Sequence, residues 1–207
     1  TLASKLTSAI PHDAGPDVFI FAHERLRQFQ RLGIVDRSTG RMEPRAYLPQ
    51  SVAALTLDGE TYGYPLAFKC VALYVNKKLV PKPPSTTGEL EALLPALSNP
   101  KERRFGLAYE SGEPYYHAPI LLGFGGALVD AQGRTTMDTP GMAKSLAWVL
   151  KLQDHGFMPQ EVSGALVLSL FNEGRAAMVI SGPWLSADIH KDIDYQVVPL
   201  PTVSETG

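Results

Sequence analysis

Residues 171–184 read FNEGRAAMVISGPW, and this stretch changes from a helical pattern to a strand pattern at its middle. Apolar residues up to Phe171 have helical spacing, and Gly174 is the residue type that commonly closes a helix. Met178–Ile180 then has the length and branching of a buried strand. Trp184 follows at the carboxyl end of that strand, where α/β sheets hold their ligands. The stretch predicts alternating helices and strands and offers Trp184 as a stacking platform, with a ring buried in the core as the alternative.

The composition is that of an ordinary globular chain. It has 207 residues and a net charge of −2 at pH 7, and no run of basic residues suggests a nucleic acid or an anionic membrane as partner. No apolar run reaches the roughly 20 residues that a membrane-spanning helix needs. Cys70 is the only cysteine, which excludes an internal disulfide and a cysteine-based metal cluster. We therefore expect no metal, no cofactor and no nucleic-acid partner.

The rest of the chain continues the alternation of strands and helices. Val18–Phe21 is apolar at every position, as a buried parallel strand is, and Ala22–Leu32 has the pattern of a helix. Thr86–Glu89 is a capping box before an amphipathic helix, and Thr139–Pro140 opens another helix. Other expected elements are a hairpin turn at Asp58-Gly59, an extended segment at Tyr64–Val75 and strands at Phe105–Ala108 and Tyr195–Leu200. The fold class predicted is α/β with largely parallel sheets.

Reactive residues are not spaced as a catalytic centre would need them. The sequence has no G-x-S-x-G elbow, and its His residues, at 12, 23, 117, 155 and 190, have no metal-ligand spacing. Gly123–Gly126 is glycine-rich, but no Lys-Ser or Lys-Thr pair follows it, as a phosphate-binding loop requires. We therefore expect no enzyme and name no catalytic residue.

Aromatic and hydrogen-bonding residues remain at expected loop positions. The rings can pack on the C–H patches of a sugar, and charged groups can form strong hydrogen bonds with its hydroxyls. These observations make a carbohydrate the candidate ligand. The candidate set is Phe21, Glu24, Arg25, Lys69, Glu113, Tyr115, Tyr116 and Trp184.

Each candidate also has a purely structural interpretation. Glu24 and Arg25 can form a solvated helix start, since acids favour that end of a helix. Tyr115 and Tyr116 can be core residues, and Glu113 can lie in an exposed turn. The residues alone leave both interpretations open.

Five segments together resemble the carbohydrate-binding proteins of bacterial ABC importers, most closely the maltose/maltodextrin-binding family. They occur in the family's order with similar spacing, and the match covers nearly the whole chain. The segments are GPDVFIFAHERL (15–26), YPLAFKCVALYVNKKLVPKPPST (64–86), EPYY (113–116), FNEGRAAMVISGPW (171–184) and YQVVPLPT (195–202).

The resemblance implies a periplasmic-binding-protein-like (type II) architecture, with two α/β lobes, a hinge and sugar in the cleft between the lobes. Residues 1–68 would be a partial first lobe, 69–74 the hinge segment, and 75–207 the second lobe without the family's C-terminal elements. Because the family's first strand and its return crossing are not in this sequence, we expect the first lobe to be incomplete. An uncovered apolar face on that lobe predicts self-association or a rearranged lobe.

The resemblance also assigns roles, and it implies changes on the first-lobe side of the cleft. Phe21 matches a sugar-contacting Trp and keeps a ring without the indole N–H. Glu24 and Arg25 match an Asp–Arg pair, with an acid one methylene longer. Lys69 matches a cleft glutamate, which reverses the charge at a hydroxyl-binding position.

The second-lobe side is retained by the same resemblance. Glu113, Tyr115 and Tyr116 match a Glu-Pro-Tyr-aromatic set that contacts sugar hydroxyls and faces, and Trp184 matches a stacking Trp. All eight residues are therefore expected to be ligand-binding, with no metal ligand among them.

The function implied is non-catalytic binding of a maltose- or maltodextrin-like sugar in an ABC sugar import system. Its partners would be the sugar and the membrane subunits of the importer, in the periplasm or outside the cell. The alternative is a degenerate solute-binding-protein-like domain, embedded in or docking on a transporter subunit, that contacts protein instead of sugar and is membrane-associated in that case. A glycoside hydrolase is a third option, with Glu24 and Glu113 as its two carboxylates.

Overall fold

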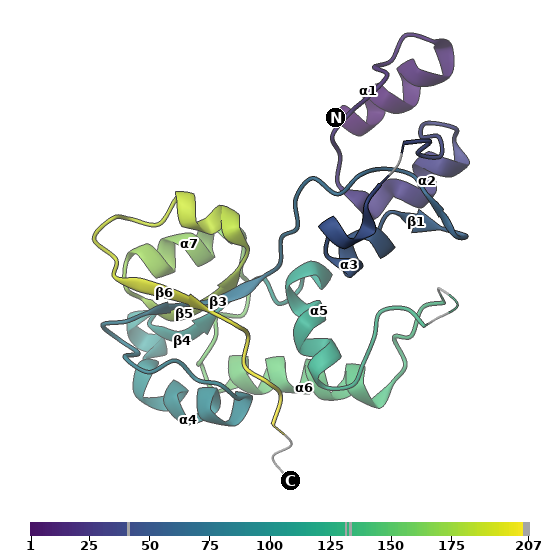
Figure 1. Cartoon of the computed structure of the whole chain (residues 1–207). Coiled ribbons are helices and arrows are strands. Elements are labelled where there is room, and N and C mark those ends of the chain that lie inside the picture. The colour runs from purple at the N-terminus through teal and green to yellow at the C-terminus, as the bar shows by residue number, and fades with distance from the viewer. Residues whose placement is uncertain (41, 131, 133, 205–207) are drawn as a thin grey trace. The chain divides into compact units, whose positions relative to one another are not determined.

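The computed structural model describes residues 1–40, 42–130, 132 and 134–204 (Figure 1). The chain divides into two compact units, Thr1–Phe68 and Lys69–Gly207, which we call the N-terminal and C-terminal units. Each unit has a hydrophobic core of its own.

The N-terminal unit is made of short helices and one hairpin. The hairpin turn expected at Asp58-Gly59 is confirmed, because Asp58 (φ 52°) and Gly59 (φ 82°) both adopt the left-handed backbone that a two-residue hairpin loop needs. The elements are α1 (Leu2–Ala9), η1 (Ile10–His12), η2 (His23–Arg25), α2 (Leu26–Arg31), η3 (Pro44–Ala46), α3 (Pro49–Ala53), β1 (Thr56–Leu57) and β2 (Glu60–Thr61).

The prediction of a strand at Val18–Phe21 is wrong. Among the described residues of this unit, β1 and β2 pair only with each other, so the segment has no sheet neighbour to share its backbone hydrogen bonds. Its side chains still alternate, as they do in extended chain. Phe19 and Phe21 contact the buried ring of Phe29, at centroid distances of 6.1 and 5.2 Å. Val18 and Ile20 are 86% and 74% exposed.

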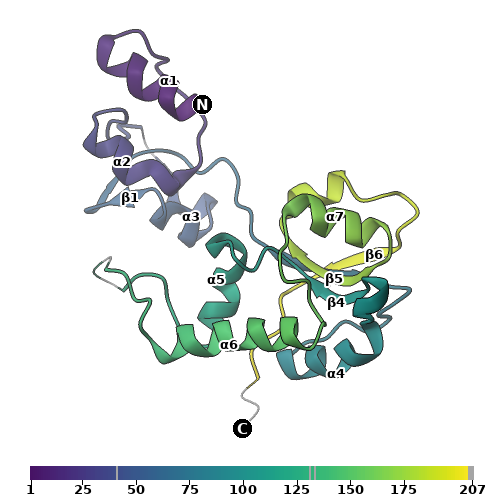
Figure 2. The same cartoon turned by 180° about the vertical axis from the view of Figure 1, so that it is seen from behind.

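The C-terminal unit has a mixed sheet between two layers of helices (Figures 1 and 2). Helix α7 covers one face, and α4 and α6 lie on the other. The elements are β3 (Ala72–Asn76), α4 (Thr87–Leu97), η4 (Pro100–Glu102), β4 (Phe105–Ala108), α5 (Pro114–Gly123), α6 (Pro140–Asp154), α7 (Gly164–Asn172), β5 (Ala176–Ser181), η5 (Pro183–Ala187) and β6 (Tyr195–Val198).

The sheet has the order β4-β5-β3-β6, and the prediction of largely parallel pairing is wrong. β4 pairs with β5 in parallel, but β3 is antiparallel to both β5 and β6. Because β3 lies between β5 and β6 and runs against them, two of the three pairings are antiparallel. A strand of apolar residues can be buried whether it runs parallel or antiparallel to its neighbours. Its apolar pattern therefore does not predict its direction.

Alternation along the strands builds the two cores. Leu73 and Val75 of β3 face the cluster that includes α4 and α6, whereas Tyr74 between them belongs to the cluster with α7. β5 is buried at every position, which matches the apolar run in its sequence. The helix end expected at Gly174 is confirmed, with φ of 66° just after α7.

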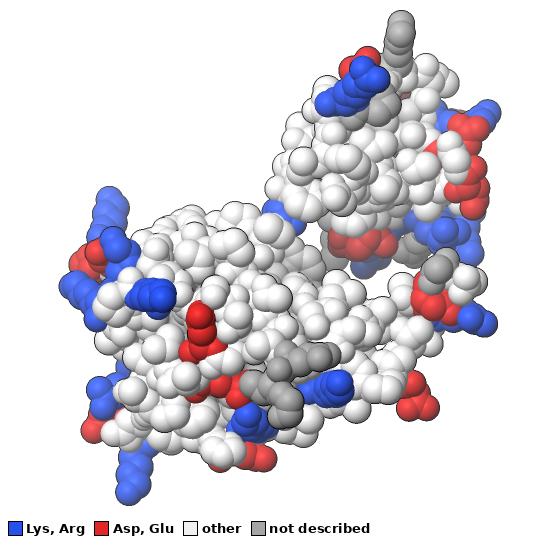
Figure 3. Space-filling model, turned by 60° about the horizontal axis from the view of Figure 1, so that its bottom comes forward, with Lys and Arg blue, Asp and Glu red and all other residues white. Residues whose placement is uncertain are grey.

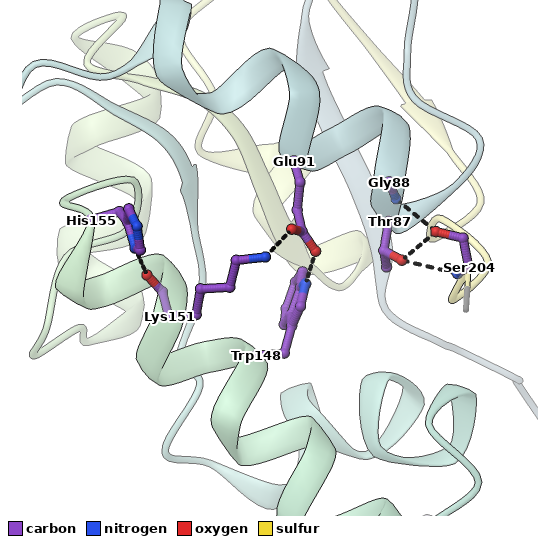
Figure 4. A network of polar contacts seen from close by, with 7 residues as sticks. All are labelled: Thr87, Gly88, Glu91, Trp148, Lys151, His155 and Ser204. Atoms are coloured by element: carbon purple, nitrogen blue, oxygen red, sulfur yellow. Dashed lines mark hydrogen bonds and ion pairs between the residues drawn. The ribbon is translucent and has the colours of Figure 1, made fainter. Parts of the chain in front are cut away.

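Polar side chains fix the start of α4, and Figure 4 shows the part of this network that joins Thr87 and Gly88 to Ser204. Thr86 caps the helix by accepting from the Glu89 amide at 3.1 Å. The Glu89 carboxylate accepts from the Ser85 amide at 2.8 Å, so the expected capping box closes one residue earlier than its usual form. Ser204 ties the C-terminal segment to the same helix start, because its hydroxyl accepts from the Gly88 amide at 2.9 Å.

Helix α4 is joined to α6 by one carboxylate. Glu91 accepts from Trp148 Nε1 at 2.7 Å and from Lys151 Nζ at 2.6 Å (Figure 4). Because the Trp148 ring is buried, its N–H needs this partner.

The surface carries charges of both signs. On the face drawn in Figure 3, blue and red side chains are interspersed over the described residues, in keeping with the net charge of −2. Among the described residues, no helix combines the length and the apolar character that crossing a membrane requires.

Candidate functional site

The candidate site in the C-terminal unit lies where β4 and β5 end. Because these strands are parallel neighbours, the segments that follow them leave the same edge of the sheet. After β4, α5 begins at Pro114, and Tyr115 and Tyr116 lie on its first turn. After β5, Pro183 opens η5, which carries Trp184. The first turns of two helices thus bring three aromatic residues to one edge.

These three side chains, Tyr115, Tyr116 and Trp184, form what we call the ring cluster. The Trp184 ring centroid lies 6.0 Å from that of Tyr115 and 6.2 Å from that of Tyr116. The two tyrosine rings meet edge to face at 5.5 Å. Tyr115 is 50% exposed and Trp184 is 39% exposed, so neither is a core ring. The cluster therefore presents aromatic surface to solvent.

Lys69 extends over this cluster. Its Nζ lies 4.9 Å from the centroid of the Trp184 ring, a cation–π distance. The side chain is exposed and has three N–H donors on a flexible stem. An ammonium in this position can hydrogen-bond a hydroxyl of a molecule stacked on the rings.

Tyr74 holds the loop that carries Trp184. The hydroxyl of Tyr74 donates to the carbonyl of Gly182 at 2.8 Å and lies 3.2 Å from the hydroxyl of Ser186. Tyr74 is buried in β3 and also stacks on Tyr195. It fixes the start of η5, and its role was not predicted from the sequence.

A second residue missed by sequence reasoning is Glu110, which follows β4. Its carboxylate lines a cavity of about 230 Å³ together with Tyr116 and Trp184. The pKa of the Tyr116 phenol is raised, first by burial and then by the negative charge of the Glu110 carboxylate. No motif marks Glu110, because its importance comes from packing between distant segments.

A wider groove of about 700 Å³ is lined in part by Tyr115. Its lining includes Lys69, Tyr115 and Pro119 and apolar residues of β6 and the segment after it. Tyr115 thus borders this groove, while Tyr116 borders the smaller cavity. The ring cluster thus contributes lining residues to two hollows of the same unit.

His117, one turn along α5, is part of the fold. Its Nδ1 lies 3.1 Å from the Tyr109 hydroxyl and its Nε2 lies 3.2 Å from the Ser145 hydroxyl. Burial lowers the pKa of His117, and burial of Tyr109 raises the pKa of that phenol. The described residues contain no group of His, Cys, Asp and Glu side chains that could hold a metal ion.

The whole chain matches one protein family. Residues 1–207 fit the family described as bacterial extracellular solute-binding protein. The chain belongs to this family. The α/β, periplasmic-binding-protein-like (type II) fold class expected from the sequence is thereby confirmed.

Curated relatives of this solute-binding protein include three named for maltotriose, maltodextrin or a maltooligosaccharide. It is 29% identical to the maltotriose-binding protein of Pyrococcus abyssi (strain GE5 / Orsay), over 100% of this chain and 46% of that protein. It is 27% identical to the maltodextrin-binding protein MdxE of Bacillus subtilis (strain 168), over 93% of this chain and 49% of that protein. It is 28% identical to the maltooligosaccharide ABC transporter solute-binding lipoprotein of Streptococcus pneumoniae (strain ATCC BAA-255 / R6), over 70% of this chain and 37% of that protein.

The matches also describe the extent of this solute-binding protein. The chain spans about half the length of the curated relatives that align with most of it.

The boundaries expected at 1–68, 69–74 and 75–207 remain predictions. The two compact units divide between Phe68 and Lys69, and Ala72–Tyr74 of the expected hinge lie in β3.

Of the eight expected site residues, the structure brings Lys69, Tyr115, Tyr116 and Trp184 together. Glu113 is exposed at the N-cap of α5, and its side chain makes no capping hydrogen bond. The other three residues lie in the N-terminal unit: Phe21 contacts Phe29, and Glu24 and Arg25 are exposed in η2.

Proposed function

We propose that this solute-binding protein binds a maltose- or maltodextrin-like oligosaccharide reversibly, without covalent chemistry. The observation that carries the proposal is the ring cluster, whose exposed aromatic faces suit the C–H patches of glucose units. Relatives named for maltotriose and maltodextrin support the same class of ligand. In this proposal all eight residues expected from the sequence contact the sugar.

The polar members of the proposed site would bind the sugar hydroxyls. Lys69 donates hydrogen bonds, and Glu113 and Glu24 accept them, while Arg25 adds a planar set of donors. Since Glu24 and Arg25 lie in the N-terminal unit, the proposal gives each unit a share of the hydroxyl contacts. Phe21 would add one more aromatic face.

The proposed setting is a sugar import system of the ABC type, in the periplasm or outside the cell. One relative is named as the solute-binding lipoprotein of such a transporter. The partners proposed are the oligosaccharide and the membrane subunits of the importer. Closure of two lobes around the sugar would present the protein to those subunits. Self-association through the apolar surface of the N-terminal unit is proposed as well.

Calorimetric titration with maltose and maltotriose tests the proposal. We expect weak binding, with Kd near the millimolar range, or about −4 kcal/mol. Trp184→Ala should weaken binding at least tenfold, because the indole, which contacts both other rings of the cluster, is lost. Leu150→Ala is the matched control, since Leu150 is an exposed apolar residue of α6 outside the cluster. No heat at millimolar maltotriose would count against the proposal.

A second candidate function is protein contact without sugar binding. It is favoured by one observation, namely that the ammonium of Lys69 already occupies a position over the Trp184 ring. A stable fold that binds a transporter subunit and gives no response to maltotriose would support this candidate.

Cleavage of maltotriose that disappears in Glu113→Gln would instead support the third option, a glycoside hydrolase.

A further inference from the structure

A small cavity adjoins the ring cluster inside the C-terminal unit. Its volume is about 230 Å³, and its walls come from the segment after β4, the first turns of α5 and α7, the end of β5, and η5. Tyr116 and Trp184 belong both to this lining and to the ring cluster. A ligand that lies on the rings would therefore contact two residues of the cavity lining.

The cavity is small for an oligosaccharide. Pockets that take drug-sized ligands have volumes of about 300–1,000 Å³. A cavity of about 230 Å³ suits one sugar ring, and the remaining units of a longer chain would lie outside it, over the ring cluster. The geometry thus separates one glycosyl unit from the others.

Glu110 supplies the polar wall. Its Oε2 would lie 3.0 Å from a β-carbon built on Gly164, so the absence of a side chain there leaves room for the carboxylate over the first turn of α7. Its negative charge acts on the Tyr116 phenol and helps to raise the pKa of that group. A carboxylate has about four lone-pair sites, so further acceptor capacity remains.

The other lining residues decide which ligand chemistry fits. Val167, Leu168 and Ile180 give apolar walls, and Asp188 is exposed at the rim. Among the described residues that line the cavity there is no Lys or Arg, so an anionic group would meet only carboxylate charge from them. A neutral unit with apolar C–H faces and several hydroxyl donors matches both kinds of wall.

We propose that this cavity holds one glycosyl unit of the bound oligosaccharide and that Glu110 accepts hydrogen bonds from its hydroxyls. The inference rests on the proposed sugar binding and adds a specificity-determining residue to it. Glu110 then acts from the lining of the cavity, while Glu113 remains the exposed carboxylate at the start of α5.

Two variants test this inference by calorimetric titration with maltotriose. Glu110→Gln keeps the shape of the side chain but removes its charge, and it should weaken binding about tenfold or more, as expected for loss of a hydrogen bond to a charged group. Ala165→Tyr places a ring at a residue that lines the cavity, and it should weaken binding to a similar extent. Glu102→Gln is the matched control, because Glu102 is an exposed carboxylate paired with Arg104 at 2.8 Å.

A second readout shows whether the local structure survives in Glu110→Gln. Removing the carboxylate charge should lower the pKa of Tyr116, which is measured by ultraviolet difference titration against a Tyr116→Phe reference.

The outcomes separate the two proposals. If the unchanged protein binds maltotriose and both variants bind it within twofold of that value, the cavity assignment is overturned and the proposed function stands. If the unchanged protein gives no heat with maltotriose, both are overturned. A tenfold loss in both variants, with the Glu102→Gln control unchanged, supports the cavity assignment.

Discussion

The benzo edge of Trp184 lies directly against Gly182. A β-carbon built on Gly182 would be 2.1 Å from Cη2 and Cζ3 of the ring, a distance that real β-carbons do not show. The backbone of Gly182 is extended, with φ of −96°, so a side chain is excluded here by the ring and not by the backbone conformation. This contact is part of what holds the indole in the ring cluster.

Gly182→Ala should therefore displace the indole without unfolding the protein. The methyl group forces the Trp184 ring off Gly182, and maltotriose binding should weaken at least fivefold. Near-ultraviolet circular dichroism reports the change at the ring, and calorimetry reports the affinity.

Gly63→Ala is the control for this change. A β-carbon at Gly63 would meet only Leu55 at 3.9 Å, which is an ordinary contact. Binding by Gly182→Ala that equals binding by Gly63→Ala would show that the indole position does not matter for the ligand.

The link between α4 and α6 predicts unequal effects of two truncations. Glu91→Ala leaves the buried Trp148 N–H without its acceptor and should lower the free energy of unfolding by about 1–3 kcal/mol. Lys151→Ala removes only an exposed ammonium from the same carboxylate and should cost about 0–1 kcal/mol. Urea unfolding followed by tryptophan fluorescence measures both, and equal losses would contradict the assignment of the Trp148 hydrogen bond as the stronger link.

Local patterns were sufficient to predict most elements of this fold. The hydroxyl of Thr139 caps α6 by accepting from the Met142 amide at 3.2 Å, and Asp58-Gly59 forms its hairpin turn, because these signals act within a few residues. The strand expected at Val18–Phe21 failed because a strand needs partners that its own residues do not specify. The antiparallel direction of β3 could not be predicted either, because it also depends on the neighbouring strands.

Local patterns were likewise sufficient to predict some residues of the candidate site but not others. Tyr115, Tyr116 and Trp184 could be named from short motifs at the starts of helices, where the chain leaves the sheet. Glu110 could not, because its place depends on the approach of α7 at Gly164, far along the chain.

The apolar segment of the N-terminal unit predicts self-association of this chain. Val18 and Ile20 are exposed, as are Leu66 and Phe68 on a second extended segment. Val18→Lys combined with Ile20→Lys should lower the average mass measured by light scattering, since a charge on each side chain opposes apolar contact. A single sharp monomer peak with a normal melting transition for the unchanged chain would contradict the prediction.

The buried His117 predicts a loss of stability in acid. Ser145 donates its hydroxyl proton to the carbonyl of Met142 at 2.9 Å, so it accepts from Nε2–H of His117, and Nδ1 is left to accept from Tyr109. Protonation of Nδ1 would remove that acceptor, and burial accordingly lowers the pKa of His117 in the folded state.

The sign of the pH effect follows from proton binding. Below the ordinary His pKa of about 6.5 the unfolded chain binds a proton that the folded chain does not, so the stability is full above that value and is lost as the pH falls toward the lowered folded-state pKa. Urea unfolding should give a lower free energy of unfolding at pH 5.5 than at pH 7.5, and His117→Gln should reduce this difference. His190→Gln is the control, because His190 is exposed, and a pH difference that is the same in both variants would exclude His117 as its source.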